Sequence, residues 1–317
     1  MIRFISTLDK EILEMNYLSI FGRIKLKEAK FNNIIKDYPF ICEIIPEKYR
    51  SFSAILVAPF NILVSIYFDY QECITKSSYS SVIGNKFKSI FNYDSYSSKI
   101  GNFLIKTLNG FPVHNCNYCD LEKISGYKDS NSGKIIRSFE TEHILDKGQC
   151  PILALSLYNF VPSCKTCNNQ HHKGSNTLGR NKEETILLSP TSLNNRFAEE
   201  VTFTVLPLNE DIKDLKMFES NDDLEIDFKG ETSKYERTIS MFHLKDRYNA
   251  NKNKIFEMIQ SFRTWSIDLS GGLIFDTYKR AEIFENIFHF KSRSENFEPM
   301  DKCRRDIFEN HFGKIPE

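Results

Sequence analysis

Four cysteines stand in two pairs, and within each pair two residues separate the cysteines. Cys116 and Cys119 form the first pair, and Cys164 and Cys167 form the second. A Cys-x2-Cys turn presents two thiolates to one ion, and two such turns complete the closed tetrahedral shell of a structural zinc site. The sequence therefore predicts one zinc ion bound by four thiolates.

Polar residues suited to phosphodiester cleavage lie between and beside these pairs. Glu142 precedes His143, Asn159 follows in an apolar run, and Asn168 comes directly after the last cysteine. A neutral imidazole, with an ordinary pKa of about 6.5, can activate a water molecule near neutral pH. A divalent ion held by carboxylate and amide oxygens stabilises charge on the phosphoryl oxygens. These residue types indicate a metal-dependent nuclease.

The order Cys-x2-Cys, Glu-His, Asn, Cys-x2-Cys-Asn resembles the HNH endonuclease family, in the four-cysteine branch that binds a structural zinc. The resemblance covers Asn115 to Leu178, and several independent spacings agree within it. In that family a β-hairpin followed by a helix forms the ββα-metal fold, with a divalent ion held against it. The resemblance implies a phosphodiester hydrolase that cuts DNA and leaves a 5′-phosphate.

The resemblance also implies a role for each residue. His143 is the general base that takes a proton from the attacking water, and Asn159 orients its ring through a hydrogen bond. Glu142 and Asn168 hold a catalytic Mg²⁺ or Mn²⁺. The four cysteines hold zinc and take no part in the reaction. The family usually has Asp at the position of Glu142, so the nearby Glu140 is a second candidate for this metal ligand.

Elements that position these residues are also predicted. Side chains alternate along Lys134 to Ile144, which indicates a strand after a polar turn at Ser125 to Gly133. Adjacent residues of a strand face opposite ways. Glu142 and His143 can therefore serve one site only at the end of the strand, where Leu145 to Gly148 lets the chain turn.

A helix is predicted after the second strand, with Ser163 as its N-cap and Gly174 as its stop. On such a helix, His172 lies four residues past Asn168 and projects toward the proposed catalytic metal. We therefore expect His172 or Lys173 to contact a phosphate of the substrate.

The charge distribution bears on nucleic-acid binding. Lys and Arg total 42 and Asp and Glu total 42, so attraction for phosphates must be local. Phe160 to Lys182 contains four basic residues and no acidic residue. Glu199 to Glu231 contains 11 acids against three lysines. The first stretch predicts a basic face, and the second predicts a solvated acidic surface.

The remaining composition indicates a cytoplasmic protein that does not associate with a membrane. Four further cysteines are scattered, which suits a reducing cytosol. The most apolar stretch, Ala54 to Phe68, has 15 residues and contains Pro59, whereas a bilayer span needs about 20. Charged residues within Met1 to Lys10 argue against a secretion signal.

We predict an α+β protein in three parts. Residues 1–107 form a mainly helical region, 108–185 form the zinc-stapled ββα nuclease core, and 186–317 form a mixed region. Within the last part, Val201 to Leu208 and Leu224 to Phe228 alternate like the strands of a hairpin. Tyr235 to Trp265 and Leu273 to His289 have helical spacing.

A second hypothesis is a non-catalytic module, stabilised by the same zinc, that binds nucleic acid or acts as a scaffold. Asn159 would then cap a turn before Pro162, and Lys165 and Lys173 would be solvated surface. A zinc deaminase is excluded, because it requires His-x-Glu and Pro-Cys-x2-Cys. Here the residue two past His143 is Leu145, and a serine separates Pro162 from the second cysteine pair.

The expected partner is DNA, and RNA stays an open alternative because the motif encodes only phosphate chemistry. HNH nucleases with unrelated flanking regions occur in bacterial anti-phage systems, often beside an ATPase or a sensor protein. By this resemblance we expect a role in antiviral defence and a protein partner of that kind.

Overall fold

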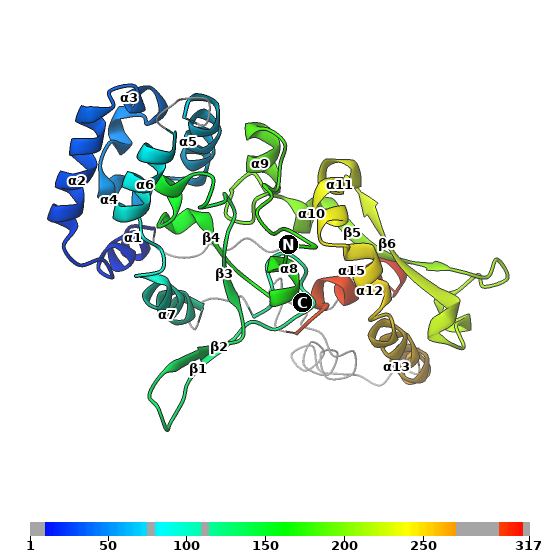
Figure 1. Ribbon diagram of the computed structural model, residues 1–317. Helices are drawn as coiled ribbons and strands as arrows, with labels where there is room; N and C mark the ends of the chain where they lie inside the picture. Colours follow the sequence, from blue (N-terminus) through cyan, green and yellow to red (C-terminus); the bar gives the residue numbers. More distant parts are fainter. Residues whose placement is uncertain (1–9, 75–79, 109–113, 271–297, 313–317) are drawn as a thin grey trace. The chain divides into compact units, whose positions relative to one another are not determined.

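The computed structural model describes residues 10–74, 80–108, 114–270 and 298–312. These residues form helices and three antiparallel two-stranded sheets, which confirms the α+β class (Figure 1). The chain divides into two compact units, which we describe separately. The first unit comprises Ile2–Phe111 and Ile124–Arg196, and the second comprises Pro112–Lys123 and Phe197–Glu317. This division differs from the three predicted parts, because the N-terminal helices and most of the predicted nuclease core share one unit.

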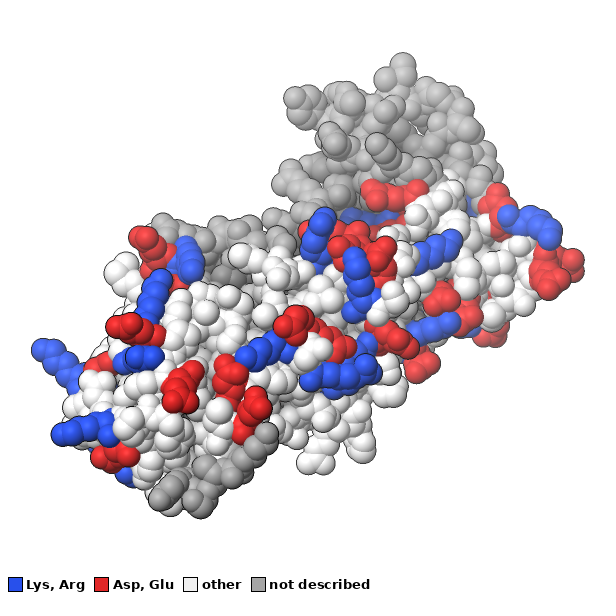
Figure 2. All heavy atoms as spheres, turned by 90° about the horizontal axis from the view of Figure 1, so that it is seen from above, with Lys and Arg blue, Asp and Glu red and all other residues white. Residues whose placement is uncertain are grey.

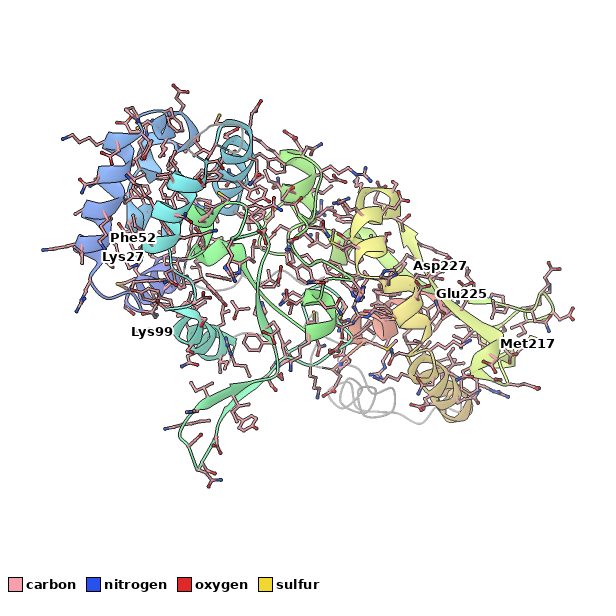
Figure 3. All side chains as sticks on the ribbon, in the orientation of Figure 1. Lys27, Phe52, Lys99, Met217, Glu225 and Asp227 are labelled. Carbon is pink, nitrogen blue, oxygen red and sulfur yellow. The ribbon has the colours of Figure 1, made fainter. Side chains whose placement is uncertain are left out.

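Helices make up the N-terminal part of the first unit. They are α1 (Lys10–Leu18), α2 (Ile24–Asp37), α3 (Ile41–Ile44), α4 (Phe52–Leu56), α5 (Phe60–Cys73), α6 (Ser80–Ile90) and α7 (Ser97–Leu108). Their apolar faces bury a cluster of aromatic rings, in which Phe91 contacts Phe31 and Phe52 with ring centroids 5.9 and 5.1 Å apart. The ammonium of Lys27 lies 5.2 Å from the centre of the Phe52 ring (Figure 3). Such packing of large rings stabilises the helical region.

Two small sheets follow in the same unit. β1 (Gly126–Lys128) pairs with β2 (Ile135–Arg137), and β3 (Glu140–His143) pairs with β4 (Phe160–Ser163). The single strand predicted over Lys134 to Ile144 is therefore wrong, because it is two strands in different sheets. The break falls at Ser138, whose hydroxyl and amide bond to the backbone of Ser125 at 2.7 and 2.9 Å. This closes the first sheet and frees β3 to pair elsewhere.

The predicted helix from Ser163 to Gly174 is wrong in length. Only one turn forms, α8 (Lys165–Asn168), and its N-cap is Cys164, whose sulfur accepts from the amide of Cys167. The Asn169 side chain ends the helix, because its oxygen accepts from the amide of His171 at 2.9 Å. The helical spacing that aligned His172 with Asn168 therefore does not apply. The unit closes with α9 (Lys182–Leu188).

The second unit is built on one hairpin. β5 (Val201–Pro207) pairs with β6 (Leu224–Gly230) along their whole length, as predicted. The helices of this unit are α10 (Phe197–Glu200), α11 (Thr232–Met241), α12 (Leu244–Asn249), α13 (Asn253–Ser270) and α15 (Asp301–Phe312). The stretch Tyr235 to Trp265 is thus three helices, and Leu273 to His289 lies outside the described residues. Phe203 joins the hairpin to α12, with its ring centroid 4.4 Å from that of Tyr248.

Charged side chains of both signs are interspersed on the face shown in Figure 2. Even the acidic stretch is partly neutralised, since Lys245 pairs with Glu225 at 3.0 Å and Asp227 at 3.3 Å on β6 (Figure 3). The predicted basic face is reduced as well. Lys173 is fully buried and Lys182 pairs with Asp69 at 2.7 Å, which leaves two exposed basic residues in that stretch, Lys165 and Arg180. No helix in the described part of the chain is long and apolar enough to cross a membrane.

Candidate functional site

The four cysteines of the two pairs come together. The sulfur atoms of Cys116, Cys119, Cys164 and Cys167 all lie within 4.8 Å of one another, and the four residues are buried. Thiolates at about 2.3 Å from a tetrahedral zinc ion stand about 3.8 Å apart, so this cluster can hold zinc. No open position remains on a zinc ion with four protein ligands, which fits a structural role.

Residues far along the chain support the first cysteine pair. Within the second unit, a guanidinium nitrogen of Arg247 lies 3.4 Å from the sulfur of Cys119, and the Tyr248 hydroxyl donates to the Cys119 carbonyl at 2.8 Å. Four thiolates around one Zn²⁺ leave a net negative charge, which a nearby cation offsets. No sequence pattern points to these two residues, because 128 positions separate Arg247 from Cys119.

The carboxylate of Glu142 meets a buried ammonium. The Lys173 Nζ lies 2.6 Å from Glu142 Oε1 and donates to the carbonyl of His143 at 2.8 Å. Lys173 is 0% exposed and Glu142 is 6% exposed. Burial raises the pKa of Glu142, and the charge of Lys173 opposes that rise. The prediction that Lys173 contacts a substrate phosphate is therefore wrong. Its ammonium is enclosed because a buried carboxylate requires a counter-ion.

The ring of His143 is enclosed and held by one backbone carbonyl. Its Nε2 lies 3.0 Å from the Ala154 oxygen, and its centroid lies 4.6 Å from the Tyr93 ring and 4.9 Å from the Phe160 ring. A carbonyl oxygen only accepts, so we assign the proton to Nε2 and a free lone pair to Nδ1. Burial and the charge of Lys147 lower the pKa of His143 to about 3, which leaves the ring neutral.

Asn159 acts on the loop rather than on the histidine. Its Oδ1 accepts from the Leu145 amide at 2.7 Å, and its Nδ2 donates to the carbonyls of Leu145 at 3.0 Å and Leu153 at 3.1 Å. The predicted hydrogen bond from Asn159 to the His143 ring is therefore wrong. The loop uses both donors of the amide, and Ala154, the residue after Leu153, binds the ring instead.

The other proposed metal ligand, Asn168, ends α8 and is half-buried. This helix packs against β3, the strand that carries Glu142. Glu140 is half-buried at the start of β3, on the same side of the strand as Glu142 by alternation. The carboxylate and the amide are oxygen donors of the type that Mg²⁺ prefers. A divalent ion at Glu142 would have to share this carboxylate with Lys173.

His172, the second predicted phosphate contact, is half-buried, and its Nδ1 lies 3.1 Å from the side-chain oxygen of Asn169. The ring is therefore tied to the turn that follows α8. Its contact with a substrate stays a prediction.

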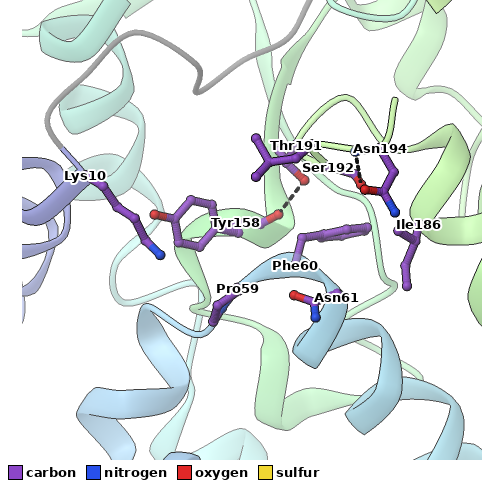
Figure 4. Close-up of a pocket in the computed structure, with 10 residues that line it drawn as sticks. Lys10, Pro59, Phe60, Asn61, Tyr158, Ile186, Thr191, Ser192 and Asn194 are labelled. Carbon is purple, nitrogen blue, oxygen red and sulfur yellow. Dashed lines mark hydrogen bonds between the residues drawn. The ribbon is translucent and has the colours of Figure 1, made fainter. Parts of the chain in front are cut away.

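The first unit also contains a pocket of about 500 Å³ (Figure 4). None of the predicted site residues lines it. Its wall includes Phe60 and Tyr158, and the Thr191 hydroxyl donates to the Tyr158 carbonyl at 2.9 Å. Tyr158 precedes Asn159, so the pocket borders the segment that leads into β4. Its lining includes Lys10 but no histidine and no carboxylate, and it is not the candidate catalytic site.

No model of a known protein family, no characterised protein and no solved structure matches this chain.

Proposed function

We propose that this protein is a metal-dependent HNH endonuclease that hydrolyses DNA phosphodiester bonds. The observation that carries the proposal is the geometry of His143, whose Nε2 lies 3.0 Å from the carbonyl oxygen of Ala154, so that Nδ1 keeps the lone pair that a general base needs. The element order supports it further. β3 pairs antiparallel with β4, and α8 follows β4 directly, which is the order of a ββα core.

In the proposed reaction, His143 Nδ1 takes a proton from a water molecule as the water oxygen attacks phosphorus. The bond from phosphorus to the 3′-oxygen breaks, and the product keeps a 5′-phosphate. Glu142 and Asn168 would hold a Mg²⁺ or Mn²⁺ ion, which would stabilise negative charge on the phosphate and the leaving oxygen. Lys173 fixes the end of β3, because it binds both the Glu142 carboxylate and the His143 carbonyl.

The experiment is plasmid nicking by the purified, zinc-loaded chain. We expect conversion of supercoiled DNA to the open circle with Mg²⁺ or Mn²⁺, arrest by EDTA, and loss of activity in His143→Ala with its zinc content unchanged. His311→Ala, on α15 in the second unit, is the matched control and should nick at the normal rate. Nicking by His143→Ala at the rate of the unaltered chain would refute the proposed base. Parallel reactions with single-stranded DNA and RNA identify the substrate.

A non-catalytic zinc-stabilised module that binds nucleic acid is the second candidate. The buried Glu142–Lys173 pair favours it, because the carboxylate already has a counter-ion. Failure of the unaltered chain to nick any substrate with either metal, while it still binds nucleic acid, would select this candidate.

The biological setting that we propose is bacterial antiviral defence, with an ATPase or a sensor protein as partner. It is supported by the family resemblance alone. Equal plaque counts on bacteria expressing the unaltered chain and His143→Ala, over a panel of phages, would count against it.

A further inference from the structure

The β1–β2 hairpin carries a small exposed apolar face. Tyr127 and Ile136 are directly opposite each other in the register, and they are 63% and 42% exposed. Their side chains therefore form one cross-strand pair on one side of the ribbon. Figure 1 shows the hairpin extending away from the helices of its own unit. Two exposed lysines, Lys128 and Lys134, lie near the turn of the hairpin.

The base of the hairpin is fixed. Gly126 lies so close to α7 that a Cβ there would stand 2.4 Å from the Ile105 side chain. On β2, the guanidinium of Arg137 packs over Gly101 of α7 and donates to the Thr141 hydroxyl at 3.2 Å. The ribbon is therefore held at its root while its far end stays exposed.

The turn at the far end is also built in one conformation. The Asp129 amide donates to the Lys134 carbonyl at 2.8 Å, and its carboxylate accepts from the Ser132 amide at 3.0 Å. Gly133 has φ 66°, a left-handed conformation that other residues rarely adopt. A preformed ribbon binds without the entropic cost of ordering a loop.

We propose that the β1–β2 hairpin is a DNA-contacting element that enters a groove of the duplex held at the nuclease site. This inference rests on the proposed function and names the form of its substrate. The hairpin leads into the site within one chain segment, because only Ser138 and Phe139 separate β2 from β3, which carries Glu142 and His143. Tyr127 and Ile136 face the groove, and the lysines lie beside the phosphates.

Charge and dimensions favour duplex DNA over other partners. From Gly126 to Arg137 the chain has three cations and one carboxylate, although the whole chain is neutral. The major groove of B-DNA, about 12 Å wide, admits a two-stranded β-ribbon. The deep, narrow major groove of A-form RNA does not admit side chains. The excess of cations near the apolar pair favours a polyanionic partner.

Binding is measured separately from cleavage by placing all variants in the His143→Ala chain. The probe is a fluorescent 30-base-pair DNA duplex, and single-stranded DNA and duplex RNA of the same sequence are the comparison ligands. Tyr127→Ser with Ile136→Ser removes the apolar pair, and we expect duplex DNA to bind at least tenfold more weakly. Val82→Ser, an exposed apolar residue on α6, is the matched control and should bind normally.

The lysines are tested by salt dependence. Each phosphate contact contributes about 0.9 to the slope of log K against log salt, so Lys128→Ser with Lys134→Ser should flatten it by about 1.8. Lys30→Ser with Lys36→Ser, both exposed on α2, should leave the slope unchanged. Circular dichroism and zinc content confirm that each variant is folded.

Two outcomes overturn the inference. In the first, both hairpin variants bind duplex DNA within twofold of the parent. In the second, the variants weaken single-stranded DNA or duplex RNA as strongly as duplex DNA. Neither outcome bears on the proposal that His143 is the general base, because only the nicking assay tests that proposal. If the unaltered chain nicks nothing but the hairpin variants lose duplex binding, the hairpin inference stands and the nuclease proposal falls.

Discussion

The buried pair of Glu142 and Lys173 gives the sharpest test of how the candidate site is built. In Lys173→Met the carboxylate of Glu142 stays enclosed by β3 and β4 but loses the ammonium at 2.6 Å. The carbonyl of His143 loses a donor at the same time. A methionine has nearly the volume of the lysine stem, so the change removes charge and hydrogen bonds with little loss of packing.

The expected magnitude follows from the burial of both groups. Breaking a buried ion pair by removing one partner costs about 3–5 kcal/mol, because the other charge is left uncompensated. Since Glu142 is 6% exposed, we expect the lower end of this range, about 3 kcal/mol, for Lys173→Met. Glu142→Gln should cost about 2 kcal/mol, because the buried ammonium of Lys173 loses its counter-ion but keeps an oxygen that accepts its hydrogen bond. The double variant leaves no buried charge without a counter-ion. Its cost should therefore be about 2 kcal/mol, far below the sum of the two single-variant costs.

The assay is urea unfolding of the zinc-saturated chain at pH 7.5 without other divalent ions. Circular dichroism monitors the unfolding. With a slope of about 3 kcal/mol per molar, a loss of 3 kcal/mol moves the midpoint by about 1 M. Lys165→Met, the exposed lysine at the start of α8, is the control and should stay within about 0.5 kcal/mol. Single-variant costs that simply add in the double variant would show that the two side chains do not interact, and our description of the site would fail.

Two further predictions concern the loop and the zinc cluster. Asn159→Ala should lower the free energy of unfolding by about 3 kcal/mol in the same urea assay, because three buried backbone groups lose their partner; a loss below about 1 kcal/mol would contradict the structure. Cys167→Ser should reduce bound zinc below one ion per chain by elemental analysis, whereas Cys303→Ser, outside the cluster, should retain it; equal zinc in both variants would contradict the four-cysteine site.

Patterns that are local in sequence were predicted well. Two Cys-x2-Cys turns define their ligand type and count by themselves, and the structure brings all four sulfurs together. The alternation of Val201 to Leu208 and Leu224 to Phe228 likewise predicted the β5–β6 hairpin, because period-two burial is a property of each strand alone.

Interactions that depend on tertiary packing were not predictable. A lysine after a short helix has the same sequence signature whether it faces solvent or a buried carboxylate. Lys173 faces the buried carboxylate of Glu142. The length of α8 was not predictable either, since Asn169 ends the helix with its own side chain five residues before Gly174. That early end carries Lys173 off the helix surface on which it was expected to meet a phosphate.

The contacts of Asn159 explain why an amide suits this position. The loop between β3 and β4 presents two carbonyls, at Leu145 and Leu153, and one amide, at Leu145, to the same buried side chain. Only a group with two donors and an acceptor satisfies all three, which an aspartate or a leucine of similar size cannot do. The three hydrogen bonds of Asn159 fix the backbone at Leu153. The next carbonyl, that of Ala154, binds His143 Nε2. Asn159 therefore positions the proposed base through the main chain, one residue removed from the ring.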